Sequence, residues 1–98
     1  GTQEFTDVFE AAVRMFPDDE TANLNAANAA MRHGDLSTAE NYLTKAGSSA
    51  EAVYARGALA IRSKDYRTAV RCMRMAHEMG LRAAEIILAE LRGRGYTE

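Results

Sequence analysis

Apolar residues along this chain recur every three or four positions, within short segments separated by helix-breaking residues. This spacing predicts amphipathic helices, because positions three and four apart share one helix face. The breaks fall at Pro17, Gly34, Gly47, Ser63-Lys64 and Gly80. The segments between them predict six helices, over residues 3–16, 20–33, 36–46, 49–62, 66–79 and 82–92.

Five of these segments present an apolar stripe that we expect to be buried. In chain order the stripes are Phe5, Val8, Phe9, Ala12, Val13 and Phe16; Leu36, Ala39, Leu43 and Ala46; Val53, Ala55, Ala58, Leu59 and Ile61; Tyr66, Ala69, Val70, Met73 and Ala76; and Ala83, Ile86, Ile87 and Leu91. Polar residues that suit N-caps precede the later helices: Asp19 or Thr21, Asp35 or Ser37, Ser48 or Ser49, and Asp65. The chain is therefore expected to be all-α, with a core too small for a deep catalytic cavity.

Two stretches of the chain repeat at a constant offset. Residues 34–39 (Gly-Asp-Leu-Ser-Thr-Ala) align without gaps with residues 64–69 (Lys-Asp-Tyr-Arg-Thr-Ala), and the offset is 30 (65 − 35). The same offset pairs Leu43 with Met73, Ala46 with Ala76, Ala27 with Gly57 and Ala30 with Ala60. Such hairpins have an apolar stripe that none can cover alone, so we expect them to stack on one another.

These residues resemble the tetratricopeptide repeat, in which a small residue in the first helix precedes a Gly-Asp-aromatic turn and a second helix with spaced alanines. Residues 20–49 and 50–80 correspond to two units, residues 3–17 to the second helix of a partial unit, and residues 81–95 to a capping helix or the first helix of another partial unit. The resemblance implies one domain over residues 1–98, a right-handed α-α superhelix of about six antiparallel helices. The period of 30 is shorter than the family's usual period of about 34, and the closing proline is absent after both units. Met79-Gly80-Leu81 is also similar to the related Sel1-like repeat.

A second resemblance concerns cellular context. Residues 22–28 (Ala-Asn-Leu-Asn-Ala-Ala-Asn) and 54–57 (Tyr-Ala-Arg-Gly) resemble helical-repeat tails of some bacterial outer-membrane-associated proteins. This implies a domain excised from a larger protein of the bacterial periplasm or cell envelope. Cys72 is the single cysteine, which fits a reducing compartment and equally an envelope protein without disulfides. No apolar run is long enough to span a bilayer, so we expect no direct membrane insertion.

Charge is divided unevenly along the chain. Residues 1–49 carry eight acids and three bases, a balance of −5, and residues 50–98 carry six acids and nine bases, a balance of +3. This polarity is suited to orienting a partner or a neighbouring copy. Helical surfaces also carry charge with no such role, so both interpretations stay open.

Residues that carry chemistry are too sparse for an active site. His33 and His77 lie far apart, and Cys72 precedes His77 by five residues, which places the two about 140° apart around one helix. Zinc sites need about four ligands at close spacing. The motif Gly93-Arg94-Gly95 ends a helix, whereas a phosphate-binding glycine motif lies between a strand and a helix. We therefore predict no catalytic residues, no metal, no cofactor and no enzymatic activity.

The tetratricopeptide resemblance implies that the first helix of each unit lines a groove for an extended peptide. The asparagines Asn23, Asn25 and Asn28 lie on one such helix, where an amide can bind a peptide backbone with both donor and acceptor. Tyr54, on the other first helix, is either an aromatic anchor for a peptide or a residue packed between hairpins. The candidate groove residues are Asn25, Asn28, Arg32, Tyr54, Ala58 and Arg62.

One known form of this groove is not expected. Asn28 stands where carboxylate-binding members of the family have a clamp asparagine. Leu24 and Ala55, however, replace the lysine and the second asparagine of that clamp. The resemblance therefore predicts no carboxylate clamp.

Arg67, Arg71 and Arg74 form a candidate basic stripe on one predicted helix, at spacing i, i+4, i+7. Such a stripe suits an acidic peptide, an anionic surface or nucleic acid. Three arginines without interleaved aromatic residues are more typical of a solvated helix face, so we expect no nucleic-acid partner. The sequence predicts a monomeric protein-interaction or scaffold module that binds a peptide or a partner domain. The alternative is a purely structural spacer or assembly domain of a larger envelope protein, with no ligand of its own.

Overall fold

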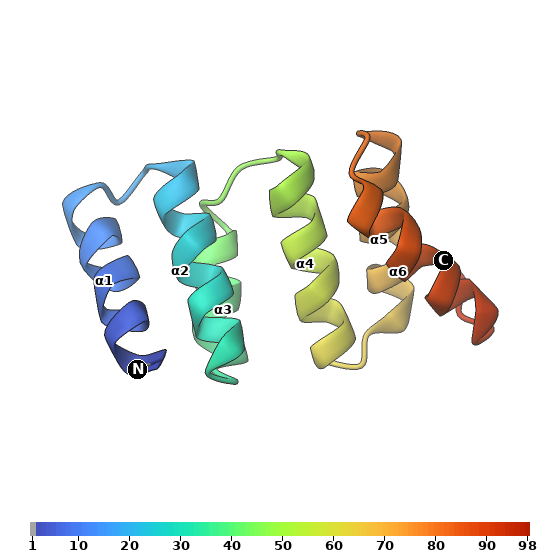
Figure 1. Cartoon of the computed structure of the whole chain (residues 1–98), viewed down its shortest axis with the longest axis horizontal. Helices are drawn as coiled ribbons and strands as arrows, with labels where there is room; N and C mark the ends of the chain where they lie inside the picture. Colours follow the sequence, from blue (N-terminus) through green and yellow to red (C-terminus); the bar gives the residue numbers. More distant parts are fainter. Residues whose placement is uncertain (1) are drawn as a thin grey trace. The chain divides into compact units, whose positions relative to one another are not determined.

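The computed structural model describes residues 2–98, with side chains described from Val8 onward. Its helices are α1 (Thr2–Met15), α2 (Glu20–Arg32), α3 (Leu36–Leu43), α4 (Ala50–Arg62), α5 (Tyr66–Glu78) and α6 (Arg82–Gly93), and the described chain contains no strand (Figure 1). The all-α class and the six helices are confirmed. The helices form two compact units, Gly1–Gly47 with α1 to α3 and Ser48–Glu98 with α4 to α6.

The predicted helix ends agree with the structure to within two residues, with one exception. The helix predicted to end at residue 46 ends at Leu43, so this part of the prediction is wrong. Turn hydrogen bonds replace the helical pattern there, including one from the Ala46 N–H to the Leu43 carbonyl at 3.2 Å. Gly47 follows with a φ of +81°, which a side chain would strain. Helix α3 ends before residue 46 because the chain turns at this glycine, although Ala46 remains buried.

The turn inside each predicted unit has the same hydrogen bonds in both copies. At the end of α2, Gly34 has a φ of +79° and the Asp35 N–H donates to the Ala30 carbonyl at 2.9 Å. At the end of α4, Lys64 has a φ of +62° and the Asp65 N–H donates to the Ala60 carbonyl at 2.8 Å. Both turns are Schellman motifs, which satisfy the last carbonyls of a helix.

The aspartate of each turn then caps the next helix. The Asp35 carboxylate accepts a hydrogen bond from the Thr38 N–H at 3.2 Å, and the Asp65 carboxylate accepts one from the Thr68 N–H at 3.3 Å. Asp19 and Ser49 cap α2 and α4 in the same way. Of the alternatives that the sequence left open, the caps are therefore Asp19 and not Thr21, and Ser49 and not Ser48. One short turn thus ends one helix and starts the next, and this explains why residues 34–39 and 64–69 repeat.

The first unit has a core of small side chains. Its buried apolar residues are Ala26, Ala27, Ala29, Ala30 and Met31 of α2, Ala39 and Leu43 of α3, and Ala46. Helix α1 packs on α2, and Phe9, Ala12 and Val13, which were expected to be buried, are half-buried. Val8 and Phe16 were expected to be buried with them, but they are 63% and 59% exposed. Phe5 lies outside the residues whose side chains are described.

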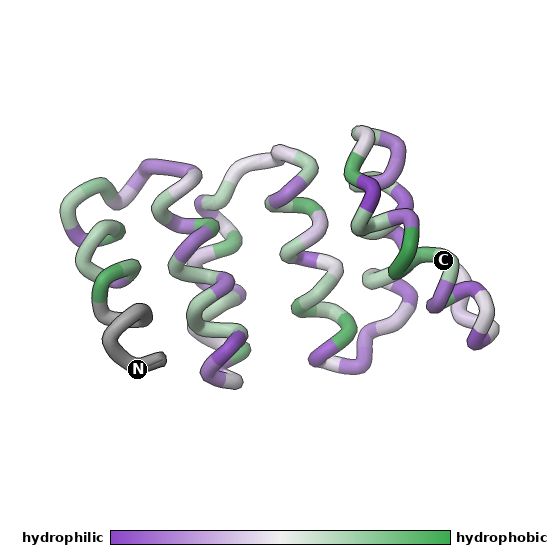
Figure 2. Tube along the Cα trace, in the orientation of Figure 1, coloured by the Kyte–Doolittle hydropathy of each residue, from purple (hydrophilic) through white to green (hydrophobic). Residues whose placement is uncertain are grey.

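The second unit has larger core side chains, and α5 lies at its centre because it packs on both α4 and α6. Its buried core cluster is Val53, Ala60, Ala69, Val70, Cys72, Met73, Ala76, Ala84, Leu88 and Leu91. Figure 2 shows apolar and polar positions alternating along these helices, as amphipathic packing requires. Gly57 lets α4 approach α5 closely, since a Cβ there would stand 2.8 Å from the Met73 Cε and 3.1 Å from the Cys72 Cβ.

The buried face of α6 differs from the predicted one. Ala83 and Ile86 were expected in the core and are exposed, whereas Ala84 and Leu88 are buried. The observed stripe is displaced from the predicted one by one residue, or about 100° around the helix. Apolar residues lie on both faces of α6, so periodicity alone did not determine which face packs on α5.

Candidate functional site

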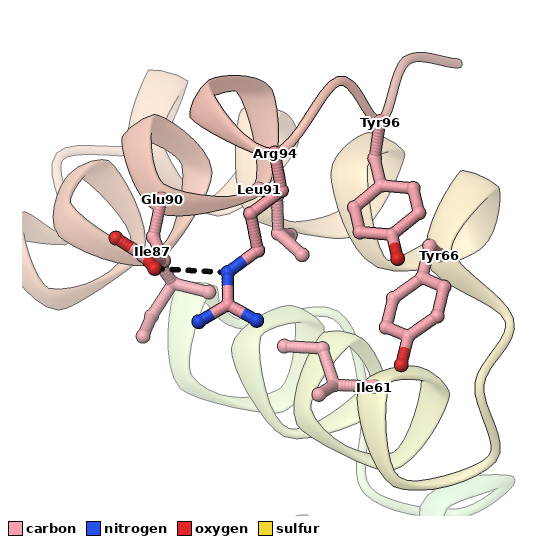
Figure 3. A pocket seen from close by; sticks show the side chains of 7 residues that line it. All are labelled: Ile61, Tyr66, Ile87, Glu90, Leu91, Arg94 and Tyr96. Carbon is pink, nitrogen blue, oxygen red and sulfur yellow. Dashed lines mark hydrogen bonds and ion pairs between the residues drawn. The ribbon is translucent and has the colours of Figure 1, made fainter.

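A small apolar pocket lies entirely within the second unit. It has a volume of about 260 Å³ and is lined by Ile61, Tyr66, Ile87, Glu90, Leu91, Arg94 and Tyr96 (Figure 3). Ile61 comes from the last turn of α4, Tyr66 begins α5, and the others come from α6 and the residues after it. The pocket therefore forms where three helices of one unit converge, and its position does not depend on the first unit.

Two tyrosines form one wall of this pocket. The rings of Tyr66 and Tyr96 stack with their centroids 4.2 Å apart and an interplanar angle of 16°. Tyr96 reaches this position because Gly95, with a φ of +92°, turns the chain back after α6. The Tyr96 N–H donates to the Leu91 carbonyl at 3.1 Å, so another Schellman turn fixes the tyrosine at the end of α6.

The other edge of the pocket is polar. The Arg94 Nε donates to the Glu90 carboxylate at 2.9 Å, one helical turn away, as Figure 3 shows. Both side chains are largely exposed. An exposed pair of this kind contributes only about 0.2 to 1 kcal/mol, so a ligand with its own carboxylate can compete for the guanidinium.

The segments that line the pocket are rich in cations. Residues 61–67 and 87–96 together carry five bases (Arg62, Lys64, Arg67, Arg92 and Arg94) and two acids (Asp65 and Glu90), a balance of +3. A cationic surrounding attracts anionic groups and raises their local concentration. The site thus combines an apolar cavity with a surrounding that favours negative charge.

The candidate groove residues are divided equally between the two units. Asn25, Asn28 and Arg32 share one face of α2, where Asn28 is half-buried and the other two are exposed. The second unit contributes the set Tyr54, Ala58 and Arg62, on one face of α4. Tyr54 packs against the core cluster of that unit, in keeping with the packing role that the sequence left open. The groove itself stays a prediction.

Asn23 has a structural role inside the first unit. Its side chain is 1% exposed, and its Nδ2 donates to the carbonyls of Pro17 at 3.0 Å and Asp19 at 2.8 Å. These bonds hold the turn between α1 and α2. Asn23 therefore has its amide donors committed within the fold, unlike the exposed Asn25 two residues later.

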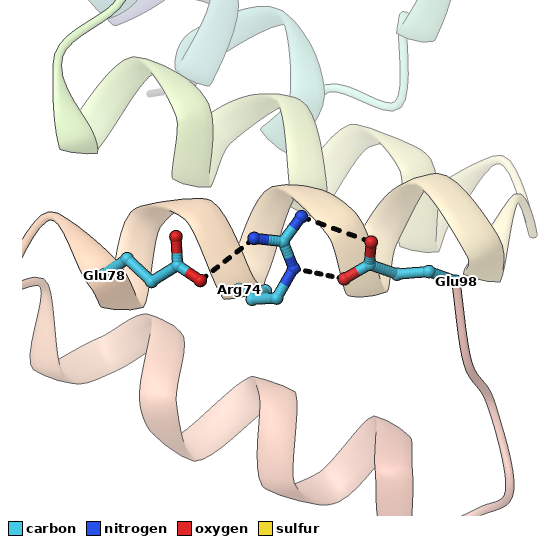
Figure 4. A network of polar contacts seen from close by, with 3 residues as sticks. All are labelled: Arg74, Glu78 and Glu98. Atoms are coloured by element: carbon cyan, nitrogen blue, oxygen red, sulfur yellow. Dashed lines mark hydrogen bonds and ion pairs between the residues drawn. The ribbon is translucent and has the colours of Figure 1, made fainter.

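The candidate basic stripe is partly neutralised. Arg74 donates to the Glu78 carboxylate at 2.9 Å and, through Nε and Nη2, to both carboxylate oxygens of Glu98 (Figure 4). These hydrogen bonds raise the pKa of Arg74 and lower the pKa of Glu98. Arg67 and Arg71 are exposed on the same helix. The stripe accordingly offers less positive charge than its three arginines suggest.

Among the residues whose side chains are described, other reactive groups do not gather into a second site. Cys72 is buried in the core of the second unit, and burial raises the pKa of its thiol, so the reactive thiolate is disfavoured. Within the described part of the chain, no three His, Cys, Asp or Glu side chains come close enough together to hold a metal ion. Over the same residues, no helix has the length and apolarity needed to cross a membrane.

Comparisons with known proteins add no family to these observations. The chain matches no protein-family model, and a search of curated proteins finds no match either. The tetratricopeptide resemblance therefore rests on the residues quoted for it.

Sequence reasoning missed the pocket because its last element lies beyond the final predicted helix. Tyr96 follows Gly93-Arg94-Gly95, where the last predicted helix was expected to end, and so it was not considered as a wall of a site. A signal was present, since the Gly95-Tyr96 step follows a helix in the same way as Gly34-Asp35. A glycine at such a position indicates an ordered turn, and the residue after it then packs back on the helix.

Proposed function

We propose that this chain is a protein-interaction module that binds a large apolar side chain of a partner polypeptide in the pocket of the second unit. The pocket itself carries the proposal. Its volume of about 260 Å³ lies below the roughly 300 to 1,000 Å³ of small-molecule sites, and its walls are mainly apolar and aromatic. A pocket of this size suits one anchoring side chain, which is how many interfaces concentrate their binding energy.

The charge around the pocket favours an acidic partner. With five bases against two acids on the lining segments, a peptide that carries Asp or Glu beside its apolar anchor gains electrostatic attraction. Arg94 is the residue best placed to pair with such a carboxylate, because it lines the pocket and its present partner Glu90 is exposed. We expect this attraction to weaken as salt concentration rises.

The arrangement of the repeats is part of the same proposal. We infer a tetratricopeptide-like scaffold because Asp35 (φ −88°, ψ 79°) and Asp65 (φ −90°, ψ 76°) have nearly the same conformation 30 residues apart. A superhelical stack and a bacterial-envelope location remain predictions that follow from the resemblance. The pocket proposal does not require either of them.

A peptide titration with two matched variants tests the pocket. The probes are blocked peptides with leucine or phenylalanine between aspartates, and control peptides with lysines in place of the aspartates. Ile87→Trp fills the pocket, and Ile86→Trp makes the same change one residue earlier, on the exposed side of α6. We expect calorimetry to show saturable binding of the acidic peptides that Ile87→Trp abolishes and Ile86→Trp preserves, with both variants folded by circular dichroism.

Three results would contradict this proposal. Equal affinity for the aspartate and lysine peptides would remove the electrostatic argument. Binding that survives Ile87→Trp would place the site elsewhere. The absence of saturable binding by any peptide would favour the spacer alternative, in which the repeats hold other parts of a larger chain and have no ligand.

A further inference from the structure

Helix α1 has a second apolar stripe beside its half-buried residues Phe9, Ala12 and Val13. Val8, Ala11 and Met15 follow the spacing i, i+3, i+7, where Val8 and Met15 are 63% and 71% exposed and Ala11 between them is half-buried. At 100° per residue, the mean direction of this stripe lies about 120° around the helix from that of Phe9, Ala12 and Val13. The apolar surface of α1 is thus wider than its contact with α2 requires, which is typical of a helix that packs against a second partner.

Helix α6 also presents an unused face. Ile86 is 60% exposed and lies opposite the stripe of α6 that is buried in the core of the second unit. Ala89 and Gly93 share this outer face with Ile86 and are exposed. Small residues beside one large apolar residue allow the backbone of another helix to approach closely.

The two units that carry these faces have opposite charge. Residues 1–47 carry eight acids and three bases (−5), and residues 48–98 carry six acids and nine bases (+3). Contact between like faces of two copies would bring together two units of the same net charge, whereas contact between an α1 face and an α6 face joins units of opposite net charge. The net charges of the units therefore favour a second copy in this orientation over one in which like faces meet.

We propose that copies of this chain associate head to tail, with the outer face of α6 in one copy packed against the Val8–Ala11–Met15 stripe of α1 in the next. This contact is heterologous, because two different faces meet in it, so each copy can use both faces at once. It departs from the monomer expected from the sequence because Val8 and Ile86, which were expected in the core, are exposed. Among the pocket residues of α6, Ile87 and Leu91 lie about 100° and 140° around the helix from Ile86, whereas Glu90 lies beside it, so the proposed contact touches one edge of the pocket.

The association is expected to be weak and dependent on concentration and salt. One helix face on another buries less than the roughly 1,000 Å² of a stable interface. Sedimentation velocity from about 10 μM to about 1 mM is therefore the appropriate measurement. We expect the weight-average mass to rise with concentration, and the affinity to fall when salt is raised to about 0.5 M.

Variants without a change in charge locate the contact. We expect Ile86→Gln to weaken self-association by about tenfold or more, because one large apolar side chain loses its burial. The double variant Val8→Gln/Met15→Gln is expected to have a similar effect from the other side. The matched control is Met75→Gln/Met79→Gln, which replaces two exposed methionines outside both faces and should leave association unchanged.

A mixing experiment tests the orientation. The α1 double variant retains its α6 face, and Ile86→Gln retains its α1 face, so a mixture of the two should form heterodimers that do not grow further. Each variant alone should remain monomeric under the same conditions. The proposal is overturned if the native chain stays monomeric over the whole range, if the methionine control loses association equally, or if the mixture forms no heterodimer.

Discussion

We predict that replacing Lys64 with glycine stabilises the chain, because Lys64 has a backbone conformation that favours glycine. Its φ is +62°, at the turn position where the first unit has Gly34 with a φ of +79°. Lys64 is also the single non-glycine residue with positive φ among those described. Its backbone N–H donates to the Ile61 carbonyl at 3.0 Å, so the turn hydrogen bonds hold it in this conformation.

The expected gain in folding stability from Lys64→Gly is the difference between two opposing free-energy changes, the relief of backbone strain and the greater loss of backbone entropy. A left-handed conformation costs a residue with a Cβ about 1 to 2 kcal/mol. A glycine loses about 0.4 to 1 kcal/mol more backbone entropy on folding, because it is more flexible in the unfolded chain. The midpoints of these two ranges, about 1.5 and about 0.7 kcal/mol, leave a net stabilisation of about 0.8 kcal/mol, which corresponds to a rise of about 3 to 6 °C in Tm for a chain of this length.

The matched control for this variant is the reverse change in the first unit. At Gly34, no atom lies within 4 Å of the position that a Cβ would occupy, so Gly34→Lys changes backbone energy without a clash. We expect it to destabilise the chain by an amount similar to the gain from Lys64→Gly. Urea denaturation and thermal melts, both followed by circular dichroism at 222 nm, measure the two changes. An unchanged or lower stability for Lys64→Gly, or a neutral Gly34→Lys, would refute the argument.

Three further predictions concern packing, buried polar groups and pH. Asn23→Ala should lower the free energy of unfolding in urea by about 1 to 3 kcal/mol, because two turn carbonyls lose their amide donors. Gly57→Leu should lower it by about 1 to 3 kcal/mol through overpacking against Met73, and adding Met73→Ala should recover part of the loss. The pKa values of Asp35 and Asp65 are lowered from 3.8 by hydrogen bonds from Thr38 and Thr68. A carboxylate with a lowered folded-state pKa stabilises the fold above its unfolded pKa, and this contribution is lost as pH falls through the folded pKa. Replacing both aspartates with Ser, which caps helices without titrating, should therefore reduce the fall in Tm between about pH 5 and about pH 2, and an unchanged pH dependence would contradict this assignment.

The helices were predictable because their start and stop signals are local. Asp35 and Asp65 each follow a residue in the left-handed conformation and precede an apolar segment. The similar sequences of residues 34–39 and 64–69 therefore predict the same turn at both places. The end of α3 was less predictable. Its apolar spacing continues to Ala46, and the turn hydrogen bonds before Gly47 interrupt the helix without disturbing that spacing.

Tertiary packing decided what the sequence could not. Helix α6 has apolar residues on two faces, and only its contact with α5 determines that Leu88 is buried and Ile86 is exposed. The pocket required a further step, because Tyr66 and Tyr96 are 30 residues apart and stack only after α6 has docked. Local periodicity contains no information about such a pairing.

The most direct test of the proposed function is to map peptide binding residue by residue. A methyl and amide chemical-shift titration with an acidic, leucine-containing peptide reports on every lining residue at once. The pocket account predicts saturable shifts at Ile61, Ile87 and Leu91, with matching changes at the stacked rings of Tyr66 and Tyr96. Shifts confined to Asn25, Asn28 and Arg32 on α2, or to Arg67 and Arg71 on α5, would contradict it and place binding on a different surface.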